Sequence, residues 1–118
     1  MSFHLDLPYL MHILDVIRDT EESVKGLTRD QFESSKDARD ASILRILVVG
    51  ETVKRISPHL TEKHPEIEWK KIAGTRDRMI HAYFDINLNS VWEIVQHDLP
   101  IFKDQIKKIK KELENRRN

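Results

Sequence analysis

The stretch from Asp37 to Ser57 constrains the fold more than any other part of the sequence. Its apolar residues recur at helical spacing, so it is predicted to form one long helix. They cover an unusually wide arc of that helix: Ile43, Leu44, Ile46, Leu47, Val48, Val49, Val53 and Ile56. A helix that is apolar over such an arc must be covered on more than one side. The stretch therefore predicts a helix packed among several others.

Cap and turn residues divide the first third of the chain. Asp6 is a suitable N-cap for a first helix, with Pro8 in the first turn, where a missing N–H does no harm. That helix is predicted to stop at Gly26. The run Thr28-Arg29-Asp30-Gln31 has the spacing of a capping box. It is predicted to open a short helix that ends at about Ser34.

Two further helices are predicted in the second half of the chain. One runs from about Ile67 to Ala82, and the last begins at a cap on Asn89 or Ser90, with a kink expected at Pro100. The 118 residues include only three Gly and four Pro, few for an all-β chain with many turns. The expected fold is therefore all-α. It is an antiparallel bundle of four main helices and a short one, in a single domain over residues 1–118.

Charge and composition exclude several classes of function. Lys and Arg number 20, and so do Asp and Glu, so no overall field draws the chain to nucleic acid or to a membrane surface. RNA binding would need a local patch. The sequence has no Cys, which excludes disulfides and thiolate chemistry and is compatible with the cytoplasm. It shows neither a signal-peptide pattern nor an apolar run near the roughly 20 residues of a membrane span. We expect a soluble, cytoplasmic protein.

The sequence offers no established cofactor motif. It lacks a glycine-rich phosphate loop, GxSxG and HExxH, so we expect no cofactor and no metal. His59 and His64 lie in a predicted connection. A metal site there has no obvious third ligand, so we expect both to be exposed surface residues. The basic run from Lys107 to Arg117 includes Glu112 and Glu114. Such a run is usually a solvated helix end, and contact with an RNA backbone is the alternative.

A cation interrupts the apolar face of the helix predicted from Ile67 to Ala82. Arg76 lies at the centre of a stripe of apolar and aromatic residues: Trp69, Ile72, Ala73, Met79, Ile80 and Tyr83. Asp77 and His81 lie one turn apart, at about 100° and 140° from that line. Local inconsistencies of this kind often mark functional sites.

Two interpretations of these residues remain open. In the structural one, Arg76 is a buried arginine paired with Glu51 or Asp77, and His81 is a polar residue at a helix end. Glu51 continues an apolar line of its own helix and points either into a groove or to solvent. In the catalytic one, His81 takes the proton of an RNA 2′-hydroxyl and Arg76 binds the charged phosphorane, without a metal. Asp77 would then orient the imidazole or hold Arg76.

Helix geometry limits the catalytic interpretation. Arg76 and His81 diverge by about 140° on a straight helix, so they do not simply face each other. The arginine can bend towards the groove edge, or the helix can loosen near His81. A third solution is a dimer in which two copies of this helix meet, which would supply both a base and an acid. Together with the apolar surplus of the Asp37–Ser57 helix, this predicts a homodimer.

Several stretches of the sequence together resemble a known family. They are Ile43–Glu51, Trp69–Phe84 with its Arg-x4-His-x-Tyr pattern, Val91–Val95 and Asp98–Pro100. Over nearly the whole chain the sequence is similar to the HepT family, the toxin halves of HEPN/MNT toxin–antitoxin pairs. The resemblance implies a helical HEPN domain, a homodimer, and metal-independent endoribonuclease activity on tRNA or mRNA.

The resemblance also implies roles for single residues. Arg76 and His81 occupy the positions of the family's catalytic pair, and Asp77 stands where Asn is commoner. Tyr83 matches the tyrosine that the partner, a minimal nucleotidyltransferase (MNT) antitoxin, modifies with AMP from ATP. AMP there would bring phosphate near Arg76 and compete with the substrate. The alternative function is a non-catalytic helical module that binds a nucleotide or the nucleotidyltransferase partner. A purely structural bundle is a third possibility.

Overall fold

The computed structural model describes the backbone of residues 2–81 and 87–116 and the side chains of residues 5–75 and 87–116. Within these ranges the chain is helical and contains no strand, which confirms the predicted all-α class. The elements in chain order are α1 (Ser2–Val24), α2 (Arg29–Ser34), α3 (Lys36–Val53), α4 (Pro58–Lys63), α5 (Trp69–His81), α6 (Leu88–Glu93), a π-helical segment (Ile94–Asp98) and α7 (Leu99–Arg116).

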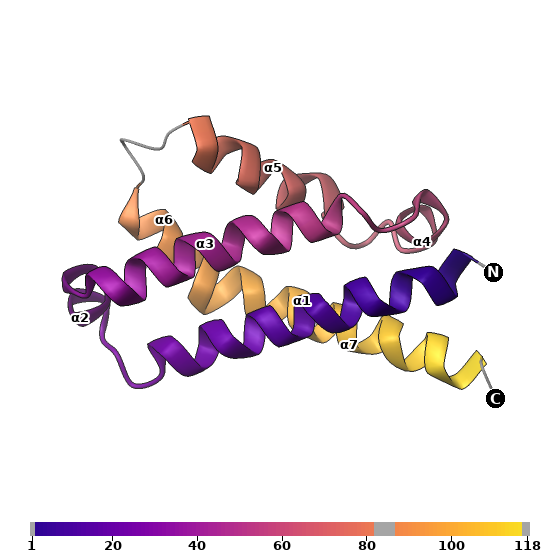
Figure 1. The fold of residues 1–118 in the computed structure, drawn as a ribbon, viewed down its shortest axis with the longest axis horizontal. Helices are drawn as coiled ribbons and strands as arrows, with labels where there is room; N and C mark the ends of the chain where they lie inside the picture. Colours follow the sequence, from indigo (N-terminus) through magenta and orange to yellow (C-terminus); the bar gives the residue numbers. More distant parts are fainter. Residues whose placement is uncertain (1, 82–86, 117–118) are drawn as a thin grey trace.

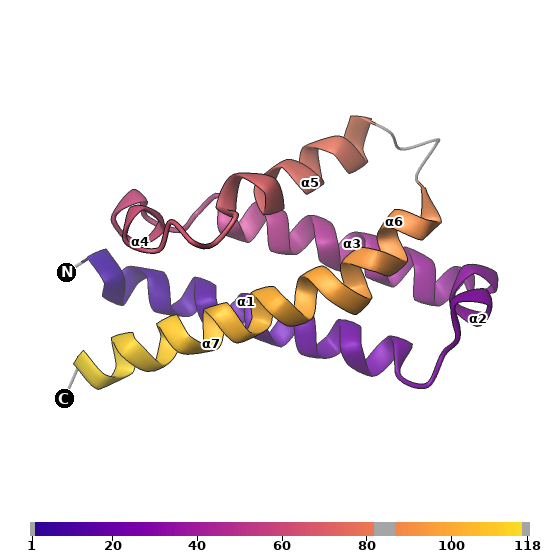
Figure 2. The same cartoon turned by 180° about the vertical axis from the view of Figure 1, so that it is seen from behind.

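The three longest helices form the body of the molecule. In Figures 1 and 2, α1 runs antiparallel to both α3 and α7, and it packs against both of them. Helix α5 packs on α3, runs antiparallel to it, and leans away from the body towards its C-terminal end. The side chains that close the core are fully or almost fully buried: Leu10, Ile13, Ile17, Phe32, Val49, Ile106 and Ile109.

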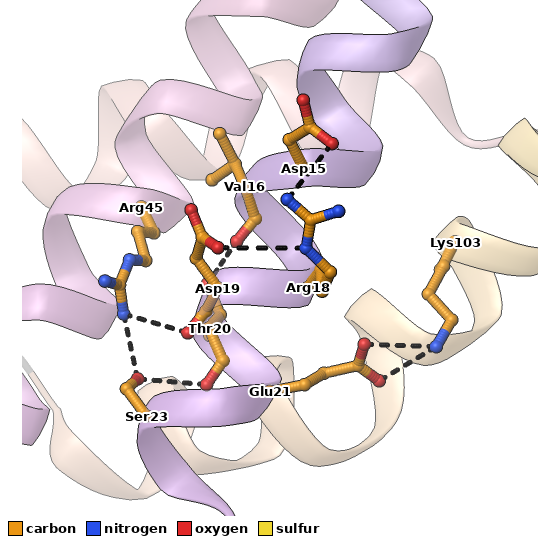
Figure 3. A network of polar contacts seen from close by, with 9 residues as sticks. All are labelled: Asp15, Val16, Arg18, Asp19, Thr20, Glu21, Ser23, Arg45 and Lys103. Carbon is orange, nitrogen blue, oxygen red and sulfur yellow. Dashed lines mark hydrogen bonds and ion pairs between the residues drawn. The ribbon is translucent and has the colours of Figure 1, made fainter.

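Polar contacts on the outside of the core connect α1 to both neighbours (Figure 3). The Nη1 of Arg45 in α3 donates to the carbonyl oxygen of Asp19 at 3.2 Å and to the Oγ of Ser23 at 2.8 Å. On the other flank, the Nζ of Lys103 in α7 lies 3.0 Å from both carboxylate oxygens of Glu21. These contacts connect α1 to α3 and to α7 at the edges of the apolar core.

The first helix begins earlier than predicted, and the role expected for Asp6 is wrong. Helix α1 starts at Ser2, so Asp6 and Pro8 lie inside it. Asp6 is only 2% exposed; its Oδ1 accepts the backbone N–H of Ser57 at 2.8 Å and its Oδ2 accepts the Ser57 hydroxyl at 2.6 Å. The carboxylate therefore binds a residue 51 positions away instead of capping its own helix.

The predicted turn between α1 and α2 is confirmed in detail. Gly26 has a φ of 78°, in the left-handed region that favours glycine after a helix. Thr28 caps α2: its hydroxyl accepts the N–H of Gln31 at 3.2 Å, and the Gln31 side chain accepts the N–H of Thr28 at 2.9 Å. This is the reciprocal capping box that the sequence indicated.

Helix α3 ends at Val53, four residues before the predicted end at Ser57. Ser57 instead caps α4, since its hydroxyl accepts the N–H of Leu60 at 3.3 Å and Pro58 occupies the first helical position. A short helix therefore occupies most of the segment predicted as a connection. Proline is tolerated at that position because the first N–H of a helix has no intrahelical partner.

The last helical region is irregular just before Pro100, where the sequence predicted a kink. Five residues from Ile94 to Asp98 form a π-helical segment, and the Leu99 N–H bonds to the Ile94 carbonyl oxygen. The wider turn falls immediately before the proline, where the regular hydrogen-bond ladder is interrupted. The predicted cap was wrong: Asn87 caps α6 by accepting the N–H groups of Asn89 and Ser90 at 2.9 and 3.3 Å.

Among the described residues, no helix is both long and apolar enough to cross a bilayer.

Candidate functional site

Trp69 fixes the beginning of α5. Its side chain is 8% exposed, and its Nε1–H donates to the carbonyl oxygen of His64 at 2.9 Å. The indole ring also lies edge-on to the ring of Phe102 in α7, with centroids 5.9 Å apart. One residue therefore connects the first turn of α5 both to the preceding loop and to α7.

The next turns of α5 lie on α3. Ile72 and Ala73 are half-buried and pack against the core, and the Thr75 hydroxyl donates to the carbonyl oxygen of Lys71 at 2.9 Å. Together with Trp69, these residues define which side of α5 faces the body. The C-terminal part of the helix extends beyond this anchored half (Figure 1).

The predicted catalytic positions share this helix. Because α5 continues to His81, positions 76, 77 and 81 follow one helical register, as expected from the sequence. Positions 76 and 81 are separated by five residues, about 7.5 Å along the axis and 140° around it. The side chains of Arg76, Asp77 and His81 lie outside the described residues, as does all of Tyr83. Their predicted roles stay predictions.

Glu51 is exposed near the C-terminal end of α3. That end lies beside the first turns of α5, because Val53 lines the same groove as Trp69 and Ala73. Since α3 and α5 run antiparallel, positions 76–81 lie towards the other end of α3 (Figure 1). The sequence left open whether the Glu51 side chain points into a groove or to solvent. Its exposure favours the solvent. Its supporting role in a site stays a prediction.

A groove with an acidic rim, which we call the α5–α7 groove, follows one flank of α5. Its volume is about 290 Å³. Its walls are mostly apolar: Ile46, Val49, Ile72, Ile94, Leu99 and Phe102. Three carboxylates, Glu66, Glu68 and Asp98, also line it, against a single cation, Lys71. The Nζ of Lys71 lies 3.5 Å from the carboxylate of Glu68, so this cation is already paired.

A second groove, the α4–α5 groove, lies on the other flank of α5 between the end of α3 and α4. It is more open and has a volume of about 580 Å³. Its lining includes three lysines, Lys54, Lys70 and Lys71, and two carboxylates, Glu62 and Glu68. The two flanks of α5 thus differ in charge. In the sequence, the only sign of this charge difference is the pair Lys70-Lys71. The flank that each residue faces depends on how α5 crosses α3.

His64 is less exposed than predicted. Its side chain is 14% exposed, with Nδ1 3.7 Å from a carboxylate oxygen of Glu66 and Nε2 3.7 Å from one of Glu112 in α7. It belongs to the junction of α4, α5 and α7, whereas His59 is exposed as predicted. Across the part of the chain that is described, no three His, Cys, Asp or Glu side chains are grouped so that they could hold a metal ion.

The basic C-terminal end of α7 lies far from positions 76–81. In Figures 1 and 2 it is next to the N-terminus of α1, at the opposite end of the molecule from the end of α5. Lys107, Lys108 and Lys111 are exposed, and Lys110 pairs with Glu114 at 3.2 Å. This agrees with a solvated helix end. The alternative, contact with an RNA backbone, stays open.

The helical fold and the position of α5 define an all-α protein with its candidate site on one projecting helix. Comparison with protein families identifies the class: the family model "Ribonuclease HepT-like" matches residues 13–109. The chain belongs to the HepT-like ribonuclease family. No solved structure gave a significant match.

Individual relatives agree with this assignment. The chain is 42% identical over 110 residues to a Methanocaldococcus jannaschii protein named "Gamma-glutamylcyclotransferase and putative RNase"; the match covers 93% of the chain but only half of that protein. It is 36% identical to a "Putative RNase" of Caldanaerobacter subterraneus, covering 86% of the chain and 91% of the relative. A "Probable ribonuclease HepT" of Thermococcus cleftensis is 33% identical, with 87% and 94% covered.

Proposed function

We propose that this chain is a metal-independent endoribonuclease in which Arg76 and His81 carry the reaction. The observation that carries the proposal is the match to the HepT-like ribonuclease family over residues 13–109, which includes the whole of α5. Both residues belong to this one helix, whose first turn is fixed by the Trp69 contacts to His64 and Phe102. A rigid element is the expected support for groups that must be positioned to within a fraction of an ångström.

The chemistry needs only a base, an acid and a fixed cation. An imidazole takes the proton of a 2′-hydroxyl, and the 2′-oxygen attacks the adjacent phosphorus. The bond from phosphorus to the 5′-oxygen breaks, and an acid returns a proton to that oxygen. Histidine suits proton transfer because its ordinary pKa is near neutral pH, and the arginine fork binds the phosphorane oxygens. The products are a 2′,3′-cyclic phosphate and a 5′-hydroxyl.

The active form in this proposal is a homodimer. Positions 76 and 81 diverge by about 140° on α5, so one copy does not easily direct both groups at one phosphate. Support for a second copy comes from the outward face of α3. Leu44 there is 61% exposed, and Leu47 and Val48, one turn further along, are only half-buried. Covering this strip would bury apolar surface, and a second α5 would supply a second histidine.

The proposed partner and the proposed regulation are those that the resemblance to the HepT family implies. We propose a toxin whose cognate MNT nucleotidyltransferase antitoxin inactivates it by AMPylation of Tyr83, in the cytoplasm, with tRNA or mRNA as the target. Position 83 is seven residues from Arg76 in sequence. AMP at Tyr83 would introduce phosphate close to the arginine and compete with RNA phosphate. Asp77 is assigned the smaller role of orienting His81 or holding Arg76.

The direct test is incubation of the purified protein with total RNA in excess EDTA, followed by analysis of the new RNA ends. The proposal expects 2′,3′-cyclic phosphate ends from the wild type and none from His81→Ala or Arg76→Ala. Circular dichroism and sedimentation would check that both variants stay folded and associated. Tight RNA or nucleotide binding with no cleavage by the wild type would instead favour the non-catalytic module.

A further inference from the structure

Packing within the described chain does not explain why position 74 is a glycine. It lies in the middle of α5, where glycine is less stable in a helix than alanine. Among the described residues, a Cβ built on Gly74 meets no atom within 4 Å outside the backbone of its own helix. No neighbour in the described chain therefore requires the absence of a side chain at position 74, and an alanine would fit there. The bare position leaves room for something that approaches α5 from outside the chain.

Lys70 lies on the same side of α5, one turn before Gly74. It is exposed, and the described side chains include no ion-pair partner for it. By helix geometry, positions 70, 74, 77 and 81 fall within about 60° of one line along the axis. The body-facing positions of Trp69 and Ile72 lie about 100° and 160° from Lys70. This outward line thus leads from an exposed cation, past a bare glycine and the position of Asp77, to the helical position of the proposed base.

The charges beside α5 indicate which kind of molecule can bind along its outward line. The α5–α7 groove on one flank is lined by three carboxylates and one cation that is already paired, which disfavours a polyanion. The α4–α5 groove beside Lys70 is lined by three lysines and two carboxylates. The Lys71–Glu68 pair lines both grooves. Without that pair, Lys54 and Lys70 stand against Glu62 in the α4–α5 groove, whereas the α5–α7 groove has only the carboxylates of Glu66 and Asp98. A polyanion that crosses α5 is therefore directed to the Lys70 side. The formal net charge is zero, so this local difference is not a consequence of a generally basic surface.

We infer that the outward line of α5 binds the ribose–phosphate backbone of single-stranded RNA, with Lys70 on a phosphate and Gly74 as the point of close approach. This rests on the proposed ribonuclease function and adds a substrate-binding site to it. Position 81 is eleven residues beyond Lys70, about 16 Å along the axis. Lys70 would therefore hold a phosphate several nucleotides from the cleaved bond. Such a remote contact contributes to binding more than to the chemical step.

A second copy of the chain is the competing occupant, since helices also approach each other closely at glycine. It makes a different prediction. Adding a methyl group at Gly74 would then weaken association of the subunits, while replacing Lys70 would leave RNA affinity unchanged. The difference in charge between the two grooves beside α5 favours RNA over a second copy. A helix–helix contact at Gly74 would not use the exposed lysine one turn away, whereas an RNA phosphate would.

The experiment compares Lys70→Gln and Gly74→Ala with a matched control, Lys107→Gln, an exposed lysine on α7. The probe is a 2′-O-methylated single-stranded oligoribonucleotide, which binds without being cut; fluorescence anisotropy gives Kd at several salt concentrations. Lys70→Gln should weaken binding about fivefold and lower the salt slope by about 0.7, as expected for one lost phosphate contact on a single strand. Lys107→Gln should match the wild type.

Gly74→Ala should raise the melting temperature and still raise both Kd and the KM for a cleavable RNA, with kcat retained. Equal RNA affinity for Lys70→Gln and Lys107→Gln would overturn the inference. So would a Gly74→Ala variant that changes only the dimer dissociation constant in sedimentation. A wild type that neither binds nor cuts RNA would instead refute the proposed function, and this outcome is distinct from an active wild type that tolerates Lys70→Gln.

Discussion

The indole N–H of Trp69 donates to the carbonyl oxygen of His64 at 2.9 Å, across the turn that leads into α5. The same ring lies against Phe102, so the helix that carries the proposed catalytic residues is oriented from its first residue. The described contacts of α5 with the body of the molecule lie in its first half, at Trp69, Ile72 and Ala73. Any change at Trp69 is therefore transmitted to positions 76–81 through a single rigid helix.

Replacing Trp69 with Phe should destabilise the protein and disturb the site. The smaller ring keeps part of the contact with Phe102 but leaves the His64 carbonyl oxygen without its donor, at a cost of about 2 kcal/mol. Urea denaturation measures the free energy of unfolding, and RNA cleavage should fall in parallel. The matched control is Trp92→Phe, at a half-buried tryptophan that packs on Phe32 instead. Equal effects of the two variants on cleavage would show that Trp69 does not position α5.

Asp6 and Ser57 should prove strongly coupled. The Asp6 carboxylate is buried and receives two hydrogen bonds from Ser57. Asp6→Ala therefore leaves the Ser57 N–H and hydroxyl without their acceptor and should cost about 3 kcal/mol. In a double-mutant cycle with Ser57→Ala, we expect a coupling free energy of about 1 kcal/mol or more. Additive losses would mean that the two residues act independently.

Gly74→Ala should stabilise the isolated protein. The substitution fits without contact, and alanine is favoured over glycine in a helix interior by about 1 kcal/mol. For a chain of this size that corresponds to a rise in Tm of about 5 °C, measurable by circular dichroism. Gly26→Ala is the control that should behave oppositely, because the φ of 78° at Gly26 disfavours any side chain. A lower Tm for Gly74→Ala would show that the position is crowded.

Leu44→Glu should dissociate the proposed dimer without unfolding the protein. Leu44 is 61% exposed, so the isolated chain loses little when it is replaced, whereas a charge in a covered apolar strip is costly. Analytical ultracentrifugation at micromolar concentration gives the assembly state. Leu5→Glu is the matched control, since Leu5 is 73% exposed on α1. A wild-type monomer, or a dimer that tolerates Leu44→Glu, would contradict this assignment of the interface.

Features set by a few consecutive residues could be predicted from the sequence. The capping box at Thr28 and the left-handed Gly26 depend on local hydrogen bonds and local sterics, so their patterns specify them. Asp6 could not be assigned in this way. An acidic residue before a proline has the pattern of a cap, and only the fold shows that its carboxylate meets Ser57, 51 residues later.

In the candidate site, too, local features could be predicted from the sequence and long-range ones could not. Helical periodicity was enough to place positions 76, 77 and 81 on one helix, and α5 confirms that register. The two grooves, with their opposite charge, could not be predicted, because they depend on how α5 crosses α3 and meets α7. The partners of His64 were missed for the same reason, since Glu112 belongs to another helix.

The most direct test of the central claim is the chemistry of the RNA ends that the purified protein produces in excess EDTA. The account predicts 2′,3′-cyclic phosphate and 5′-hydroxyl ends from the wild type. In His81→Ala it predicts loss of this cleavage by a factor of at least about a hundred, the lower end of what a general base contributes. Folded, dimeric His81→Ala that cuts RNA as fast as the wild type would contradict it, as would cleavage that EDTA abolishes.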